Sequence, residues 1–406
     1  MTQDRVPAAE PLDEGPAHLR VTLLVLALGL FVVATNAFVI AGLLPHIADD
    51  LRVHPNDVAL SITAYAAVVA VLSPVFSIAF ARVSRTGLMV AGLIVVVVGT
   101  GIVVVAPDLE LFIVGRVVAA VGGAALVPTA TAVAALLAPP HRRARSIAVV
   151  VGGFAAASAL GAPLGTLAAG YVGWRGSLLG VAILAVVCAV ATPLAVRRVP
   201  AAGSIPVRTR FRALLDSRLL FALATTVCAT GAFNTVYIFS SQLTEQTTGG
   251  AGTLLALVLF SLGVAGLVGN AAGGRLADRY GSRRVMLTVP VLFALALLLF
   301  PFAAWSLPLT VVSFMVWGLC ANAQQPAVQL RETLIDPLTA PIALAWNSTA
   351  LYLGIAIAPI FGRAAIGAAG VDAVPIGSAL LILVGVLAFQ LGYIVEGRRP
   401  GRIAPA

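Results

Sequence analysis

Side chains that could carry out chemistry are few in this chain, and they do not form the strings that enzymes use. Neither a GxSxG nor an HExxH string occurs, and the absence of lysine excludes a P-loop phosphate site and a Schiff-base amine. The three cysteines, Cys188, Cys228 and Cys320, are widely spaced and suggest neither a disulfide framework nor a metal cluster. We therefore expect no enzyme activity, no cofactor and no bound metal.

The elements that must position the polar residues are apolar stretches long enough to cross a membrane. Of the 406 residues, 60% are hydrophobic and only 10% are charged, and the mean hydropathy of +1.05 fits no soluble domain. Continuous apolar runs of about 20 residues predict membrane-spanning helices and exclude the alternating segments of a β-barrel. The predicted fold class is an all-α polytopic membrane protein with twelve transmembrane helices. The expected spans are residues 21–44, 58–79, 88–106, 111–137, 147–171, 178–196, 219–241, 252–272, 285–304, 307–330, 341–362 and 374–394.

An internal repeat divides the spans into two halves. Three pairs of similar features have almost the same offset: Arg82 and Arg279 (279 − 82 = 197), Pro163 and Pro359 (359 − 163 = 196), and Asn36 and Asn234 (234 − 36 = 198). This agreement predicts two parallel six-helix halves, as in transporters that work by alternating access. The halves are residues 21–196 and 219–394, with a basic linker at 197–218 and tails at 1–20 and 395–406.

The arginines predict the orientation in the membrane, because basic loop residues are retained on the cytoplasmic side. Most of the 25 basic residues fall on one side of the membrane if both tails are cytoplasmic. We therefore expect a multi-pass protein of the cell membrane with both termini in the cytoplasm. A net charge of +9 that is divided among many loops makes nucleic acid a poor interpretation as a partner.

The string GRLADRYGSRR at residues 274–284 is the most specific motif, and it resembles a loop signature of the major facilitator superfamily. Two glycines allow a tight turn between helices, and the carboxylate can meet a helix N-terminus across the interface. The resemblance implies that this partner is span five, close to Arg145. It also implies a conformational or gating role for Gly274, Asp278, Arg279, Gly281, Arg283 and Arg284. The alternative is a basic turn that only fixes the orientation.

Two further strings narrow the family. Gly161, Pro163 and Gly165 resemble the antiporter signature of drug exporters, in which small residues and a proline suit a hinge or a tight helix contact. Ordinary helix packing is the alternative. The string TNAFVIAGLLPHIADDL resembles the opening of twelve-helix drug:proton antiporters, including actinomycete chloramphenicol/arabinose efflux permeases. Those exporters often carry a carboxylate immediately before the phenylalanine that matches Phe38, whereas this chain has Ala37.

The absence of a carboxylate at position 37 affects how transport could be coupled to protons. A buried carboxylate is the simplest group with which to exchange a proton for a substrate. Without one at position 37, the candidates for a proton site are His46 and Asp50 near the outer mouth and Asp278 and Glu332 near the inner face. For His46 and Asp50, the alternative is a solvated position in a loop.

Polar and aromatic residues inside the spans predict a cavity between the halves. Amides and charges are costly in lipid unless they face protein or water, so Arg116 is a functional candidate. The alternatives are an arginine that reaches outward to the interface and amides that join helices. The predicted substrate-binding residues are Asn36, Phe38, Tyr65, Arg116, Phe154, Asn234, Tyr237, Asn322, Gln325, Trp346 and Asn347. Rings and amides without a carboxylate suit a neutral or weakly polar amphipathic molecule.

The leading interpretation is a secondary transporter that exports small amphipathic drugs or metabolites, such as chloramphenicol-like compounds, by alternating access and in exchange for protons. The alternative is a sugar or nucleoside permease or facilitator without proton coupling, which the missing carboxylate favours. A remote alternative is a non-transporting membrane receptor. The expected partners are a small-molecule substrate, the lipid bilayer and protons, and we expect a monomer.

Overall fold

The computed structural model describes residues 16–80, 83–139, 143–196, 199, 207–336 and 339–397, and within these ranges it contains helices and no strand. In chain order, the elements are α1 (Pro16–Leu51), α2 (Pro55–Ala79), α3 (Arg85–Val105), α4 (Leu109–Leu137), α5 (Arg143–Ala156), the π-helix η2 (Ala157–Gly161), α6 (Ala162–Ala195), α7 (Val207–Ala213), α8 (Ser217–Ile238), α9 (Ser240–Leu243), α10 (Glu245–Thr248), α11 (Gly252–Tyr280), α12 (Ser282–Leu298), the 3-10 helix η3 (Phe300–Phe302), α13 (Leu307–Ile335), α14 (Ala340–Ala369) and α15 (Ala373–Gly397).

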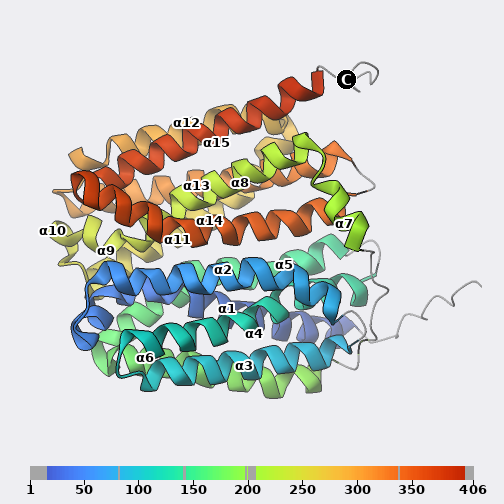
Figure 1. The fold of residues 1–406 in the computed structure, drawn as a ribbon, viewed down its shortest axis with the longest axis horizontal. Helices are drawn as coiled ribbons and strands as arrows, with labels where there is room; N and C mark the ends of the chain where they lie inside the picture. Colours follow the sequence, from blue (N-terminus) through green and yellow to red (C-terminus); the bar gives the residue numbers. More distant parts are fainter. Residues whose placement is uncertain are drawn as a thin grey trace, which may run out of the picture.

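These elements make twelve membrane crossings. Ten helical segments of the described residues are long and apolar enough to cross a membrane. The longest, Ser146–Ala195, makes two crossings, because Gly173 breaks the helix with a φ of 70° that glycine tolerates and other residues rarely adopt. α12 has 17 residues, and with η3 it adds another crossing (Figure 1). The predicted twelve-helix fold class is confirmed.

The two halves lie side by side, with α1 to α6 in the first half and α8 to α15 in the second (Figure 1). α2 packs along α14, and α11 packs along η2 and α6, so these pairs form most of the interface between the halves. We call the end at which α1 begins and α15 ends the linker end, since α7 also lies there. The opposite end, which carries α9 and α10, is the far end.

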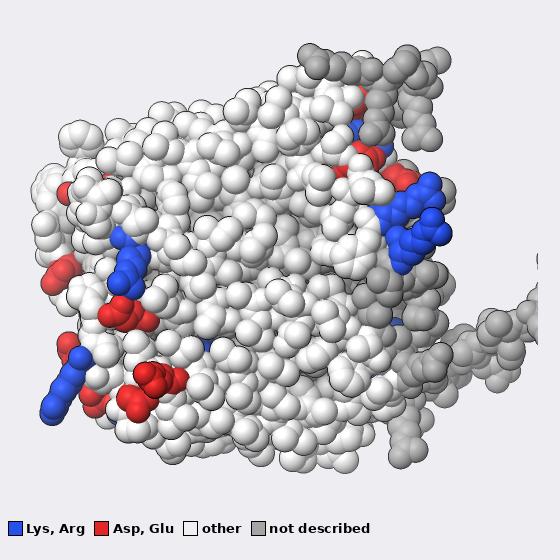
Figure 2. Space-filling model, in the orientation of Figure 1, with Lys and Arg blue, Asp and Glu red and all other residues white. Residues whose placement is uncertain are grey.

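The surface has the charge distribution of a membrane protein. Figure 2 shows charged side chains gathered at the two ends, with a broad band between them that is nearly free of charge on this face. Large apolar side chains are exposed on the helices, for example Val98 of α3, Ile183 of α6 and Leu380 of α15. In water such a surface would drive association, whereas lipid tails are a suitable solvent for it.

Candidate functional site

A small pocket lies between the halves, where α1, α2 and α5 of the first half meet α8 and α14 of the second. The residues that line it are Ala37, Phe38, Ala41, Ile62, Tyr65, Ala66, Phe154, Asn234, Tyr237, Ile238, Tyr352 and Ile355. Its volume of about 10 Å³ corresponds to about one water molecule. The pocket is therefore too small, as it stands, to hold a drug-sized molecule.

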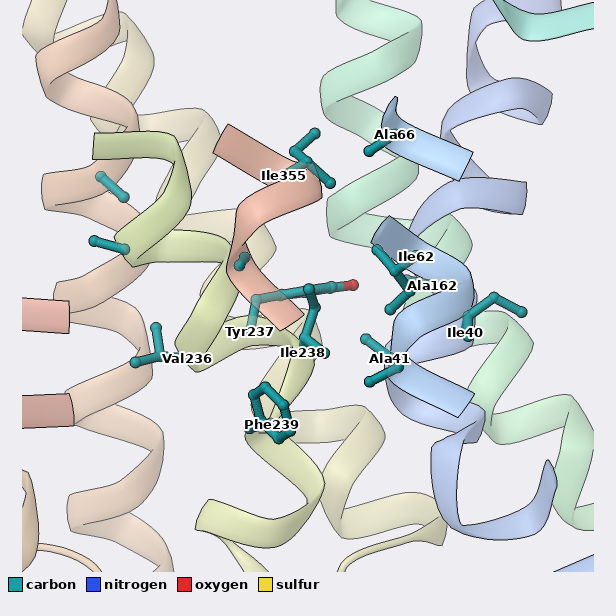
Figure 3. Close-up of a cluster of buried hydrophobic side chains, with 14 of the residues drawn as sticks. Ile40, Ala41, Ile62, Ala66, Ala162, Val236, Tyr237, Ile238, Phe239 and Ile355 are labelled. Carbon is teal, nitrogen blue, oxygen red and sulfur yellow. The ribbon is translucent and has the colours of Figure 1, made fainter. Parts of the chain in front are cut away.

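Aromatic rings from both halves close the pocket. Phe38 of α1 packs edge-on against Phe154 of α5 and Tyr237 of α8, with centroid distances of 5.5 and 5.8 Å. Phe154 in turn meets Tyr352 of α14 at 6.5 Å. The Tyr237 hydroxyl donates a hydrogen bond to the Phe38 carbonyl oxygen at 3.5 Å, and Figure 3 shows it pointing from α8 toward the first half. Such ring pairs are worth about 0.5–1.5 kcal/mol each beyond the area that they bury.

Contacts between the halves continue from the pocket toward the far end. The Thr63 hydroxyl of α2 donates to the carbonyl oxygen of Ala356 in α14 at 2.8 Å. Nearer the far end, Arg363 of α14 forms an ion pair with Asp57 of α2 at 2.9 Å. These contacts join α2 to α14 beside the pocket and near the far end.

A buried arginine lies one layer behind the pocket wall. Arg116 of α4 is only 1% exposed, so it points into the protein and does not reach outward to the interface. Its Nη1 atom donates to the backbone oxygen of Asn36 at 2.7 Å and to the Asn36 side-chain oxygen at 2.6 Å. The Asn36 amide donates to the hydroxyl of Thr100 at 2.8 Å. The guanidinium carbon lies 4.4 Å from the centroid of the Tyr65 ring, which itself lines the pocket.

The structure brings several of the predicted substrate-binding residues together. Those that line the pocket are Phe38, Tyr65, Phe154, Asn234 and Tyr237, and Asn36 and Arg116 lie directly behind them. The aliphatic lining residues Ile62, Ile238 and Ile355 were not among the predicted residues. No sequence signal distinguishes them, because aliphatic residues make up most of every span.

The other predicted residues do not line the pocket; they are Asn322, Gln325, Trp346 and Asn347. The Asn347 side-chain oxygen accepts a hydrogen bond from the Thr226 hydroxyl at 2.7 Å, and it joins α14 to α8. Trp346 packs against Phe211 of α7 with a centroid distance of 5.4 Å. The Asn322 amide donates to the backbone of its own helix at 2.9 Å, and the Gln325 amide meets a threonine of α8 at 3.5 Å. These contacts fit the alternative in which amides serve helix packing.

The glycines predicted for span five lie where η2 and α6 pack against α1. A Cβ atom on Gly161 would lie 2.0 Å from the Thr35 hydroxyl oxygen, and one on Gly165 would lie 2.3 Å from a methyl group of Val39. Larger side chains do not fit at these positions. Pro163 is buried immediately after η2, where the backbone departs from α-helical hydrogen bonding, as π-helices often do at functional sites.

The motif at residues 274–284 forms the turn between α11 and α12 at the linker end. Gly281 has a φ of 79°, which accounts for a glycine at this point of the turn. Asp278 and Arg284 are exposed, while Arg283 donates to the side-chain oxygen of Gln390 in α15 at 3.1 Å. Gly274 has open space at its Cα, and the Arg279 guanidinium lies 5.3 Å from the ring of its neighbour Tyr280. The side chain of Arg145, near the expected partner of Asp278, lies outside the described residues.

The candidate proton sites His46, Asp50, Asp278 and Glu332 all lie outside the pocket lining. Asp50 is in the last turn of α1, where it pairs with Arg175 and accepts a hydrogen bond from the Trp174 indole at 3.2 Å. Glu332, in the last turn of α13, is only 1% exposed, and neither of its carboxyl oxygens has a hydrogen-bond partner. Among the lining residues there is no carboxylate.

Comparison with known proteins agrees with this architecture. The sequence profile described as Major Facilitator Superfamily matches residues 26–263 and 221–406. The chain is 28% identical over 387 residues to the inner membrane transport protein YdhP of Escherichia coli strain K12, covering 95% of this chain and 98% of that protein. It is 27% identical over 372 residues to the MFS-type transporter YbcL of Bacillus subtilis strain 168, covering 92% and 94% of the two chains.

Solved structures show the same fold. A bacterial homolog of the human lysosomal transporter Spinster, in an inward-facing and occupied conformation, superposes with a TM-score of 0.78 at 15% identity, covering 96% of this chain and 100% of that one. The unoccupied inward-facing structure of that homolog gives a TM-score of 0.75 with the same coverage. At this identity the likeness concerns the fold alone. The profile match over nearly the whole length shows that the chain belongs to the Major Facilitator Superfamily and is a transporter, not an enzyme.

Proposed function

We propose that this chain is a secondary transporter that exports small amphipathic drugs or metabolites by alternating access, with the pocket between the halves as its substrate site. The observation that carries the proposal is the shared pocket, in which Phe38 and Phe154 of the first half face Tyr237 and Tyr352 of the second. A pocket built from both halves changes shape whenever the halves rock against each other, as alternating access requires.

The lining supports an amphipathic substrate. Aromatic and aliphatic side chains supply most of the wall, and Asn234 contributes an amide whose nitrogen already donates to the Thr230 carbonyl oxygen at 2.9 Å. A few polar groups in an apolar pocket fix the orientation of a ligand, while the apolar walls supply contact area. Chloramphenicol-like compounds have this mixed character.

The predicted topology and gating residues are part of the proposal. With the linker end in the cytoplasm, the halves at residues 21–196 and 219–394 would move as units around the pocket, and the turn at 274–284 would contact the first half near the linker end. The Asp57–Arg363 pair would separate when the pocket opens to the far end. One chain encloses a complete pocket, which supports a monomer.

A transport assay with pocket variants tests the proposal. In proteoliposomes, uptake of radiolabelled chloramphenicol should be saturable. Tyr237→Ala and Phe38→Ala should each lower the kcat/KM of uptake by about tenfold, which corresponds to about 1.4 kcal/mol. Phe302→Ala is the matched control, because Phe302 is 74% exposed and lies outside the pocket. If the pocket variants transport like the control, the pocket is not the substrate site.

A facilitator without proton coupling, for example for sugars or nucleosides, is the second candidate function. It is favoured by Ala37, which lines the pocket at the position where the resembled exporters carry a carboxylate. An imposed pH gradient separates the two candidates. Uphill accumulation driven by the gradient would support antiport, and its loss in one of Asp50→Asn, Asp278→Asn, Glu332→Gln or His46→Gln would assign the proton site. Equilibration that ignores the gradient would support the facilitator.

A further inference from the structure

Arg116 carries a positive charge for which the described residues provide no counter-charge. The described ion pairs of arginines with carboxylates involve Arg175, Arg218, Arg331 and Arg363. Arg116 bonds only to the neutral groups of Asn36, although it is 1% exposed. Burying a charge away from water is costly unless a group of opposite charge accompanies it.

The unused atoms of Arg116 form one edge of the guanidinium. Nη1 makes both hydrogen bonds to Asn36, whereas Nε and Nη2 are buried and have no hydrogen-bond partner. Two adjacent N–H groups of an arginine form a planar fork that matches the two oxygens of a carboxylate. The free edge is therefore a complete donor pair for an oxyanion.

Tyr65 links the guanidinium to the pocket. Its ring lines the pocket and lies 4.4 Å from the guanidinium carbon, so the cation stacks directly against the pocket wall. The Tyr65 hydroxyl is also buried without a hydrogen-bond partner. It occupies space that Gly123 of α4 leaves open, since a Cβ atom there would lie 2.9 Å from the hydroxyl oxygen. The Tyr65 ring is therefore the part of the pocket wall against which the cation stacks.

Ala37 provides no negative charge on the pocket side of α1. It follows Asn36, the residue that Arg116 binds, and it lines the pocket. A carboxylate at this position would add a negative charge to the pocket lining, next in sequence to the residue that Arg116 binds, and the methyl group of alanine provides none. The counter-charge of Arg116 can then come from a molecule in the pocket.

We infer that the pocket takes amphipathic organic anions, with a carboxylate as the group that Arg116 binds once the Tyr65 ring has moved aside. This inference rests on the proposed function, and it changes the substrate class from neutral to anionic. The apolar walls receive the body of the molecule, and the free edge of Arg116 receives its charge.

Three molecules that differ only in their polar group test the inference: phenylbutyrate, phenylbutyramide and phenylbutylamine. Binding is measured by thermal stabilisation of the purified protein, and transport by counterflow in proteoliposomes. We expect the carboxylate to bind about tenfold more tightly than the amide, and the amine more weakly than both. Arg116→Gln should remove the preference for the carboxylate. Arg212→Gln is the matched control, because Arg212 is exposed on α7, and it should keep the preference.

Ala37→Asp gives a second test that does not depend on the folding of Arg116 variants. The new carboxylate should neutralise Arg116, abolish the preference for phenylbutyrate and increase the relative affinity for phenylbutylamine. A wild-type protein that binds the amide as tightly as the carboxylate overturns the inference. If chloramphenicol is transported without any preference for the carboxylate, the inference fails while the proposed function stands. If no compound stabilises the folded protein or is transported, both fail.

Discussion

Gly263 of α11 touches Ala159 of η2 so closely that a Cβ atom on the glycine would lie 2.2 Å from the Cα atom of the alanine. The backbones of the two halves are therefore in direct contact at a π-helical segment of the first half. Contacts of this kind need a residue without a side chain on at least one helix. A larger side chain at position 263 therefore tests the contact between α11 and η2.

Gly263→Val should force α11 away from η2 and prevent the pocket from closing. We expect the rate of chloramphenicol counterflow to fall by about tenfold or more, because the displaced interface is the one that must re-form in each transport cycle. The measurement is counterflow in proteoliposomes at equal protein content. Gly180→Val is the matched control, since Gly180 is also in a helix but has open space around its Cα. Similar rates in the two variants would contradict the prediction.

The ion pair between Asp57 and Arg363 should bias the halves toward closure at the far end by a small amount. Its side chains are 36% and 50% exposed, so the pair is worth only about 0.2–1 kcal/mol. We expect Asp57→Asn and Arg363→Gln each to change the counterflow rate by about two- to fivefold at low salt. The double variant should resemble either single variant, which a double-mutant cycle measures. Additive effects would show that the two residues act independently.

Glu396 should contribute to the stability of the second half at the linker end. It pairs with Arg331 at 2.9 Å and with Arg218 at 3.2 Å, and both arginine side chains are at most 10% exposed. Glu396→Gln should lower the free energy of unfolding by about 1–3 kcal/mol, because two buried cations lose a charged partner. The midpoint of thermal unfolding in detergent measures the effect. Asp372→Asn, at an exposed acidic residue, should leave the midpoint nearly unchanged.

Asn234 and Asn347 should respond differently to replacement by alanine. Asn234 lines the pocket, so Asn234→Ala should raise the KM for transport by about three- to tenfold with little loss of stability. Asn347 is buried against Thr226, so Asn347→Ala should lower the unfolding midpoint and leave the KM of the remaining folded protein unchanged. If Asn347→Ala raised the KM without loss of stability, the result would support a role for Asn347 in binding the substrate.

The fold was predictable because a single physical rule decides it. Apolar segments of sufficient length enter lipid as helices, and their number and spacing fix the two halves. The ends of the helices were less predictable: α1 already begins at Pro16, and α12 is shorter than a typical span. A helix continues beyond the membrane wherever packing and hydrogen bonding allow it, and hydropathy carries no information on that.

The pocket was predictable in part. Rings such as Phe38 and Tyr237 are rare inside the spans, and several of them face the interface between the halves. Asn347 is an amide like the pocket residue Asn234, and Trp346 is a ring, yet they contact Thr226 of α8 and Phe211 of α7. The residue type shows which side chains could contact a substrate. Which neighbour each side chain faces depends on the rotation of its helix, and the sequence does not specify that rotation.

The closed pocket has a consequence for the membrane as a permeability barrier. The pocket has the volume of about one water molecule and rings from both halves pack across it, so in this state it is too small for a hydrated ion or a larger solute. If the proposed transport cycle passes through this state, the pocket is not a standing channel for ions. Many copies can then reside in a membrane without dissipating the ion gradients on which the cell depends.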